Sequence, residues 1–140
     1  MTTRAQMSEL AEGEGGHTSL MRAALEGKTE TVKTLLESGA DVNERDDKGR
    51  TALMFAVTNL KTDAAKLLLD HGADVNVKAN DGGTALILAA SSGDSEIVPA
   101  LLSKGADVSA KITQTGKTAL MLAKEKGYTE IAQLLQAAET

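Results

Sequence analysis

Gly49-Arg50-Thr51-Ala52-Leu53 is the stretch that decides the fold, because its pattern, Gly-x-Thr-(Ala/Ser)-Leu, begins again at Gly16, Gly82 and Gly116. The threonines of the four copies are 33, 33 and 34 residues apart and stand at Thr18, Thr51, Thr84 and Thr118. A second marker, Gly-Ala-Asp-Val, keeps the same frame at Gly39, Gly72 and Gly105. A fixed period of this length predicts one supersecondary unit that is stacked several times.

Each unit has the local signals of a helix, a turn, a second helix and a long turn. Thr51 precedes the apolar run of residues 52–57, and a hydroxyl at that place caps the start of a first helix. Nine residues after the threonine, a glycine ends this helix in three units, at Gly27, Gly93 and Gly127. A hydroxyl and a carboxylate then mark the positive end of a second helix, at Thr29-Glu30, Thr62-Asp63, Ser95-Glu96 and Thr129-Glu130. The second helix ends at the Gly-Ala-Asp-Val marker.

These residues resemble the ankyrin repeat, whose pattern runs from Gly-x-Thr-Pro-Leu-His-x-Ala-Ala through Glu-Val-Val-x-Leu-Leu-Leu to Gly-Ala-Asp-Val-Asn. The resemblance covers about residues 16–140 and implies an all-α fold, an α-solenoid of four stacked helix-turn-helix repeats with long connecting turns. The implied repeats span about residues 16–48, 49–81, 82–115 and 116–140 of a single domain. Residues 1–15 are expected to form a flexible N-terminal lead.

Several positions depart from the family pattern. Leu60 stands where the other units have the inter-helix glycine, and a left-handed backbone is costly for a branched side chain, so Asn59 is the alternative residue for that conformation. This turn is the expected irregular position of the array. The family's histidine is replaced by Ile87 and by methionines, which we expect to pack as a buried stripe, at Met21, Met54 and Met121.

The terminal units carry polar residues where the inner units are apolar. In the last unit, Lys124 and Gln136 stand at the positions that Val57 and Leu69 occupy in the second. Terminal repeats need a wet outer face because no neighbour covers it. We therefore expect four repeats to be the complete array, and the protein to be monomeric.

Composition limits the function classes. With 15 Lys and Arg against 20 Asp and Glu, the net charge is −5, which argues against a nucleic-acid partner because phosphate binding relies on clustered cations. The chain has no cysteine, as is compatible with a reducing compartment. The polar start, to Gly16, has no signal-peptide core and no membrane span. We expect an intracellular, cytoplasmic protein without a membrane partner.

No motif predicts catalysis, a metal site or a cofactor. Gly116-Lys117-Thr118 looks like the end of a phosphate loop, but Lys111 stands where such a loop needs its first glycine. His17 and His71 occupy different repeat positions and have no positional partner. The first long turn lacks the closing glutamate of a calcium loop, so turn formation is the better explanation of Asp41, Asn43, Asp46 and Asp47. We expect that the protein is not an enzyme.

The resemblance implies a protein-binding role through a concave groove. In ankyrin-like arrays the residues before the repeat threonine, the tips of the long turns and the exposed side of the first helix line that groove. Carried over residue by residue, the groove holds His17, Leu25, Glu26, Asp47, Lys48, Arg50, Thr58, Asn59, Asn80, Asp81, Ser91, Ser92, Lys117, Glu125 and Lys126. Tyr128, on the last inter-helix turn, is the expected aromatic anchor.

Two rows of charge suggest what the groove binds. The residues before the threonines are mostly basic, namely His17, Arg50, Gly83 and Lys117, whereas the second helices begin with the acidic residues Glu30, Asp63, Glu96 and Glu130. One interpretation is a groove that favours an acidic segment of a partner protein. The other is that both rows are solvated faces. Two further functions stay open, a stability or design scaffold without a physiological partner and a small enzyme.

Overall fold

The threonine of each repeat begins a helix, as its position predicts. In the computed structural model, which describes residues 16–139, the hydroxyl oxygens of the four threonines accept hydrogen bonds from Met21, Met54, Ile87 and Met121 N–H at 3.2–3.4 Å. These bonds satisfy one of the free N–H groups at each helix start. The helices that they begin are α2 (Ser19–Glu26), α4 (Ala52–Thr58), α6 (Ala85–Ser92) and α8 (Ala119–Lys126).

A second helix follows each of these after a short turn. The second helices are α3 (Thr29–Glu37), α5 (Thr62–Asp70), α7 (Ile97–Ser103) and α9 (Thr129–Ala138). The predicted hydroxyls stand at or beside the helix starts, but the N-cap residues make no side-chain capping bond. In α7 the cap comes instead from Asp94, whose Oδ1 accepts from Glu96 N–H at 3.2 Å and Ile97 N–H at 3.4 Å.

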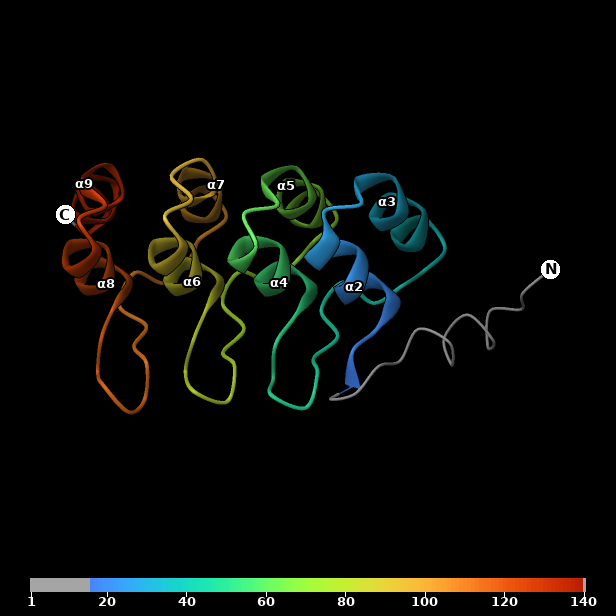
Figure 1. The fold of residues 1–140 in the computed structure, drawn as a ribbon, viewed down its shortest axis with the longest axis horizontal. Coiled ribbons are helices and arrows are strands. Elements are labelled where there is room, and N and C mark those ends of the chain that lie inside the picture. Colours follow the sequence, from blue (N-terminus) through green and yellow to red (C-terminus); the bar gives the residue numbers. More distant parts are fainter. Residues whose placement is uncertain (1–15, 140) are drawn as a thin grey trace.

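The helices form two layers (Figure 1). Helices α2, α4, α6 and α8 lie side by side in one layer, α3, α5, α7 and α9 form the second, and the long turns project from the first layer. Beyond these helices, the regular structure of the described residues is 3-10 helix at Gly16 and an isolated antiparallel β-bridge between Lys111 and Thr118. The described part of the chain is therefore an all-helical array of four stacked repeats. The expected lead of residues 1–15 lies outside the described residues.

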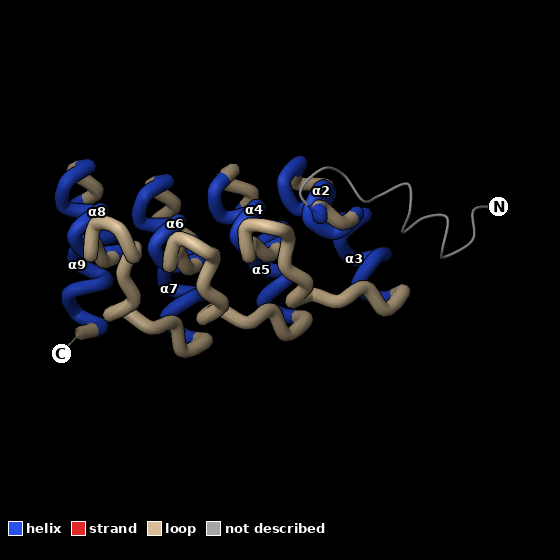
Figure 2. Tube along the Cα trace, turned by 90° about the horizontal axis from the view of Figure 1, so that it is seen from below, coloured by secondary structure: helices blue, strands red, loops and turns tan. Residues whose placement is uncertain are grey.

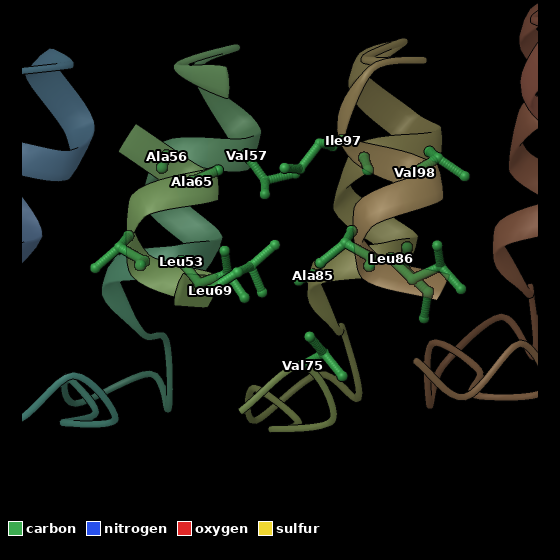
Figure 3. Packing of buried hydrophobic residues seen from close by; sticks show 14 of the residues in the cluster. Leu53, Ala56, Val57, Ala65, Leu69, Val75, Ala85, Leu86, Ile97 and Val98 are labelled. Atoms are coloured by element: carbon green, nitrogen blue, oxygen red, sulfur yellow. The ribbon is translucent and has the colours of Figure 1, made fainter. Parts of the chain in front are cut away.

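Side chains between adjacent repeats make one continuous core. Leu53, Leu68, Leu86 and Leu101 are fully buried, and Val57 and Ile97 point toward one another between the second and third repeats (Figure 3). Met21 and Met54 are buried, as expected of the methionine stripe. Met121 in the last repeat is 50% exposed, so the expectation is wrong for this residue. The reason is position, because no described element packs on the side of α8 that Met121 faces.

The inter-helix turn of the second repeat is irregular, as expected, but Asn59 does not take the left-handed conformation. Leu60 itself has φ +59°, whereas Asn59 has φ −98° and serves as the C-cap of α4. Among the described residues, Leu60 is the single non-glycine residue with positive φ. Gly27, Gly93 and Gly127 adopt the same conformation in the other three repeats. The inter-helix turn therefore has a left-handed residue at the same place in all four repeats, although in the second repeat that residue is leucine and not glycine.

None of the described helices is both long and apolar enough to cross a membrane. The described residues also hold no group of three or more His, Asp or Glu side chains placed to bind a metal ion.

Candidate protein-binding surface

The long turns of successive repeats follow one another along the array (Figure 2), and side-chain and backbone hydrogen bonds hold them in register. Within the turns, Asp41, Asp74 and Asp107 each accept a hydrogen bond at 2.9 Å from the N–H two residues later, which confirms the turn-forming role predicted for Asp41 and extends it to the equivalent aspartates of the next two repeats. Between turns, Asn43 Oδ1 accepts from Asp74 N–H at 2.7 Å, and Asn76 Oδ1 accepts from Asp107 N–H at 2.8 Å. The asparagine of one repeat thus fixes the turn of the next.

The tips of the turns are linked mainly by backbone. Asn80 N–H donates to the Lys48 carbonyl at 2.9 Å, and Thr113 N–H donates to the Asp81 carbonyl at 2.8 Å. The Asn80 side chain adds a bond to the Asp47 carbonyl at 3.1 Å. Consecutive tips therefore form a ladder, which we call the tip ladder. With the exposed sides of α2, α4, α6 and α8, it makes up what we call the tip-and-helix surface.

Asp46 is the centre of a polar cluster at the first junction between repeats. Its side chain is fully buried, and its Oδ1 accepts hydrogen bonds from Arg50 N–H at 2.8 Å and Lys48 N–H at 3.0 Å. Its Oδ2 lies 2.8 Å from Arg50 Nε. Burial acts to raise the pKa of Asp46, but the backbone and guanidinium hydrogen bonds from Arg50 outweigh it, so the pKa lies below its ordinary value.

His17 and Phe55 complete this cluster. His17 Nε2 lies 3.2 Å from Asp46 Oδ2 and 3.3 Å from Arg50 Nη2. The imidazole meets the Phe55 ring edge to face at 5.2 Å, and the Arg50 guanidinium carbon lies 4.8 Å from the centre of that ring. Arg50 therefore stacks on an aromatic face while it pairs with a buried carboxylate. The charge of Arg50 is therefore paired at the junction between the first and second repeats.

The other predicted cation of the pre-threonine row is also paired. Lys117 Nζ lies 2.8 Å from Glu125 Oε1, and both side chains are about half exposed. Neighbouring Lys126 donates to the carbonyl and the hydroxyl of Ser91 at 2.8 and 2.9 Å, which joins the fourth repeat to the third. Arg50 and Lys117, the two cations of the predicted basic row, thus already have partners within the chain.

The remaining predicted residues fall into two groups. Thr58, Asn59, Asp47, Lys48 and Asp81 are exposed on the tip-and-helix surface. Glu26 is exposed as well and pairs with Lys28 at 2.9 Å, which lowers the pKa of Glu26 through a hydrogen bond and charge attraction. The structure therefore places these side chains where a partner can reach them.

Ser92 and Tyr128 are committed to contacts between repeats. Ser92 Oγ donates to the Thr58 carbonyl at 3.5 Å. Tyr128 is half-buried, and its ring lies so close to Gly93 that a Cβ on that glycine would come within 2.9 Å of Tyr128 Cζ. Tyr128 is therefore a packing residue of the third junction as much as a surface aromatic.

Sequence patterns assigned Asp46 to turn formation and did not single out Asp94. Asp94 is buried, and besides capping α7 its Oδ2 accepts from the Thr62 hydroxyl at 2.8 Å. The available signal for Asp46 was its spacing of four residues from Arg50. For Asp94 the available signal was its position directly after Gly93, where a carboxylate can cap the next helix.

Comparison with known proteins agrees with this geometry. A family model described as ankyrin repeats (3 copies) matches residues 5–79 and 78–140, which together are most of the chain. A search of the curated proteins found no match. Ankyrin repeats are generally protein–protein interaction modules and are typically non-catalytic. From the repeat period, the stacked helix pairs and this match, we conclude that the chain belongs to the ankyrin repeat family.

Proposed function

We propose that this protein is a non-catalytic interaction module. It binds a segment of a partner protein on the tip-and-helix surface, which serves as its concave groove. The observation that carries the proposal is the tip ladder, because it fixes the backbone of successive turns by bonds at 2.8 and 2.9 Å. A preorganised backbone lowers the entropy lost when a partner binds. Exposed side chains such as Lys48 and Asp81 then project from a rigid support.

We further propose that the bound segment is acidic. Lys48 is exposed and, within the described residues, forms no ion pair. Lys117 and Lys126 are held by exposed partners, Glu125 and a serine, which a carboxylate of the bound segment can replace. Exposed ion pairs contribute little to folding, so this exchange costs little. Arg50 is different, since its partner Asp46 is buried.

The test is a charge reversal that leaves the Asp46 cluster intact. We expect Lys48→Glu with Lys117→Glu to preserve the helical circular dichroism and to weaken the natural partner at least about tenfold, or about 1.4 kcal/mol. The partner is first captured from a lysate of the source organism and then titrated in pure form. Arg50→Glu is not a suitable reversal, because it places a second carboxylate beside Asp46.

The matched control reverses charges on the second helices. Glu30→Lys with Glu130→Lys changes the same number of charges at exposed positions of α3 and α9. We expect little effect on affinity. If this control abolishes binding and the Lys48 and Lys117 reversal does not, the partner occupies the opposite face.

A further inference from the structure

Arg45 joins the first long turn to the second. Its Nη2 donates to the Lys78 carbonyl at 2.6 Å, and its Nε donates to the Gly49 carbonyl at 3.3 Å. Gly49 belongs to the turn that holds Arg45, whereas Lys78 belongs to the turn of the next repeat. Hydrogen bonds from a charged donor are stronger than those between neutral groups. One side chain therefore ties two consecutive turns together through their backbone.

The guanidinium of Arg45 lies at the contact between the two turn tips. A Cβ on Gly49 would come within 2.6 Å of Arg45 Nη2 and 2.8 Å of Asn80 Oδ1, so a glycine at this position leaves room for both groups. Asn80 forms the first rung of the tip ladder, because its N–H donates to the Lys48 carbonyl. Its side chain adds the bond to the Asp47 carbonyl. Arg45 and the first rung therefore belong to one contact between turns.

The equivalent cations of the next two repeats make no such link. Lys78 and Lys111 follow Arg45 at intervals of 33 residues, and all three are exposed. Within the described residues, neither lysine side chain donates a hydrogen bond or forms an ion pair, although the charge of Lys78 attracts Asp107. Arg45 forms no ion pair in this part of the chain either, and it donates to the two carbonyls instead. A cation that bonds backbone rather than a carboxylate points to a role in fixing the turns.

We propose that Arg45 is a positioning residue for partner binding. It fixes the first turn against the second, so that Lys48 and Asp81 project from the two tips at a constant separation, and it does not itself contact the partner segment. The inference rests on the proposed function and adds the residue that preorganises its surface. Tips that are fixed before binding lower the entropy that is lost when a partner binds. Loss of the link therefore weakens binding without removing a contact to the partner.

The experiment follows affinity and amide hydrogen exchange in the same variants of the full chain. Peptides are selected on the wild type from a random-peptide phage library, synthesised, and titrated against the wild type, Arg45→Gln and Arg45→Lys. Exchange of the Asn80 amide measures opening of the first rung, and exchange of the Thr113 amide measures opening of the second. We expect Arg45→Gln to raise exchange at Asn80 and to weaken the peptides, each at least about tenfold, and to leave exchange at Thr113 unchanged. Lysine lacks the fork that reaches two carbonyls, so Arg45→Lys should give intermediate values of both.

Two controls separate positioning from charge and from stability. Lys78→Gln removes a cation at the equivalent position of the next turn and keeps the carbonyl that Arg45 bonds, so it should change neither exchange at Asn80 nor affinity. Asp94→Ala removes the cap of α7, in an inter-helix turn. It should lower the stability of the fold and leave the affinity for the peptides unchanged.

Affinity and exchange must change together for the positioning role to hold. If Arg45→Lys binds like the wild type while exchange at Asn80 rises, or if Arg45→Gln loses affinity without faster exchange, Arg45 acts through its charge and the positioning role is overturned. An equal loss of affinity in Lys78→Gln or Asp94→Ala overturns it as well.

The charge reversal Lys48→Glu with Lys117→Glu separates this inference from the proposed function. Peptides that keep their affinity for Arg45→Gln and lose it with the reversal overturn the positioning role and leave the proposed function standing. A library that yields no peptide, or peptides that are insensitive to the reversal, overturns both.

Discussion

At the scale of single residues, Asp46 shows how one carboxylate can stabilise a junction between repeats. Its oxygens accept bonds from Lys48 and Arg50, and among the described residues no buried side-chain polar atom is left without a partner. Hydrogen bonds to a buried charged group contribute more than those between neutral groups. The same carboxylate must therefore make the stability of the first junction depend on pH.

We expect Asp46→Asn to lower the free energy of unfolding at pH 7 by about 1.5–3 kcal/mol. The folded pKa lies below the ordinary value of 3.8, so the stabilisation is fully present above that pH and is lost as the pH falls through the folded pKa. Urea unfolding of both proteins at pH 7 and at pH 3 measures this, and the difference between them should shrink at the lower pH. A difference that is the same at both pH values would contradict a stabilising carboxylate. The neighbour variant Asp47→Asn, at an exposed position, serves as the control.

At the scale of elements, helix α7 is capped by Asp94, which lies just before the predicted start signal Ser95-Glu96. Asp94 caps α7 and accepts from Thr62 at the start of α5, so one side chain joins two helix starts. We expect Asp94→Ala to destabilise the fold by about 0.5–2 kcal/mol, whereas Asp94→Asn, which keeps a capping oxygen, should cost less. Denaturant unfolding of the three proteins gives the order. Equal losses for Asn and Ala would mean that the cap contributes nothing.

Much of the architecture could be predicted because its signals are local and repeated. The capping threonines, the turn aspartates and the left-handed glycines each need only a few neighbouring residues, and a fixed period sets them in register. The burial of Asp46 and Asp94 could not be predicted in the same way, because it depends on contacts such as His17 with Arg50 and Thr62 with Asp94, which join residues more than 30 positions apart. The ion pairs of Arg50 with Asp46 and of Lys117 with Glu125 are local in sequence, but the repeat pattern does not mark them. The exposure of tip residues such as Lys48 and Asp81 could therefore be predicted, whereas the partners of Arg50 and Lys117 within the chain were not.

At the scale of the whole molecule, the outer face of α8 and α9, at the end of the described array, carries both polar and apolar side chains. Lys124 and Gln136 are exposed there, as predicted, beside the exposed Met121. We expect Lys124→Val with Gln136→Leu to join these positions into one apolar face and to cause self-association at high concentration. Light scattering over a concentration series measures it. The matched control, Lys66→Val with Asp70→Leu, changes two exposed positions of α5 and should remain as soluble as the wild type. Equal association of both variants would show that the position of the face is irrelevant.

The tip ladder also separates the residues that shape the protein from those that a partner meets. Its bonds from Asn80 N–H and Thr113 N–H end on the carbonyls of Lys48 and Asp81, so the side chains of Lys48 and Asp81 take no part in these bonds. Almost any amino acid at the position of Lys48 can offer the same carbonyl, whereas Asp81 also shapes its turn, because its Oδ1 accepts a hydrogen bond from Gly83 N–H at 2.8 Å. Mutational tolerance should therefore be high at Lys48 and lower at Asp81 and Asp46, and a lineage of such chains can acquire new partners by substitution at exposed tip positions such as Lys48 while its backbone stays unchanged.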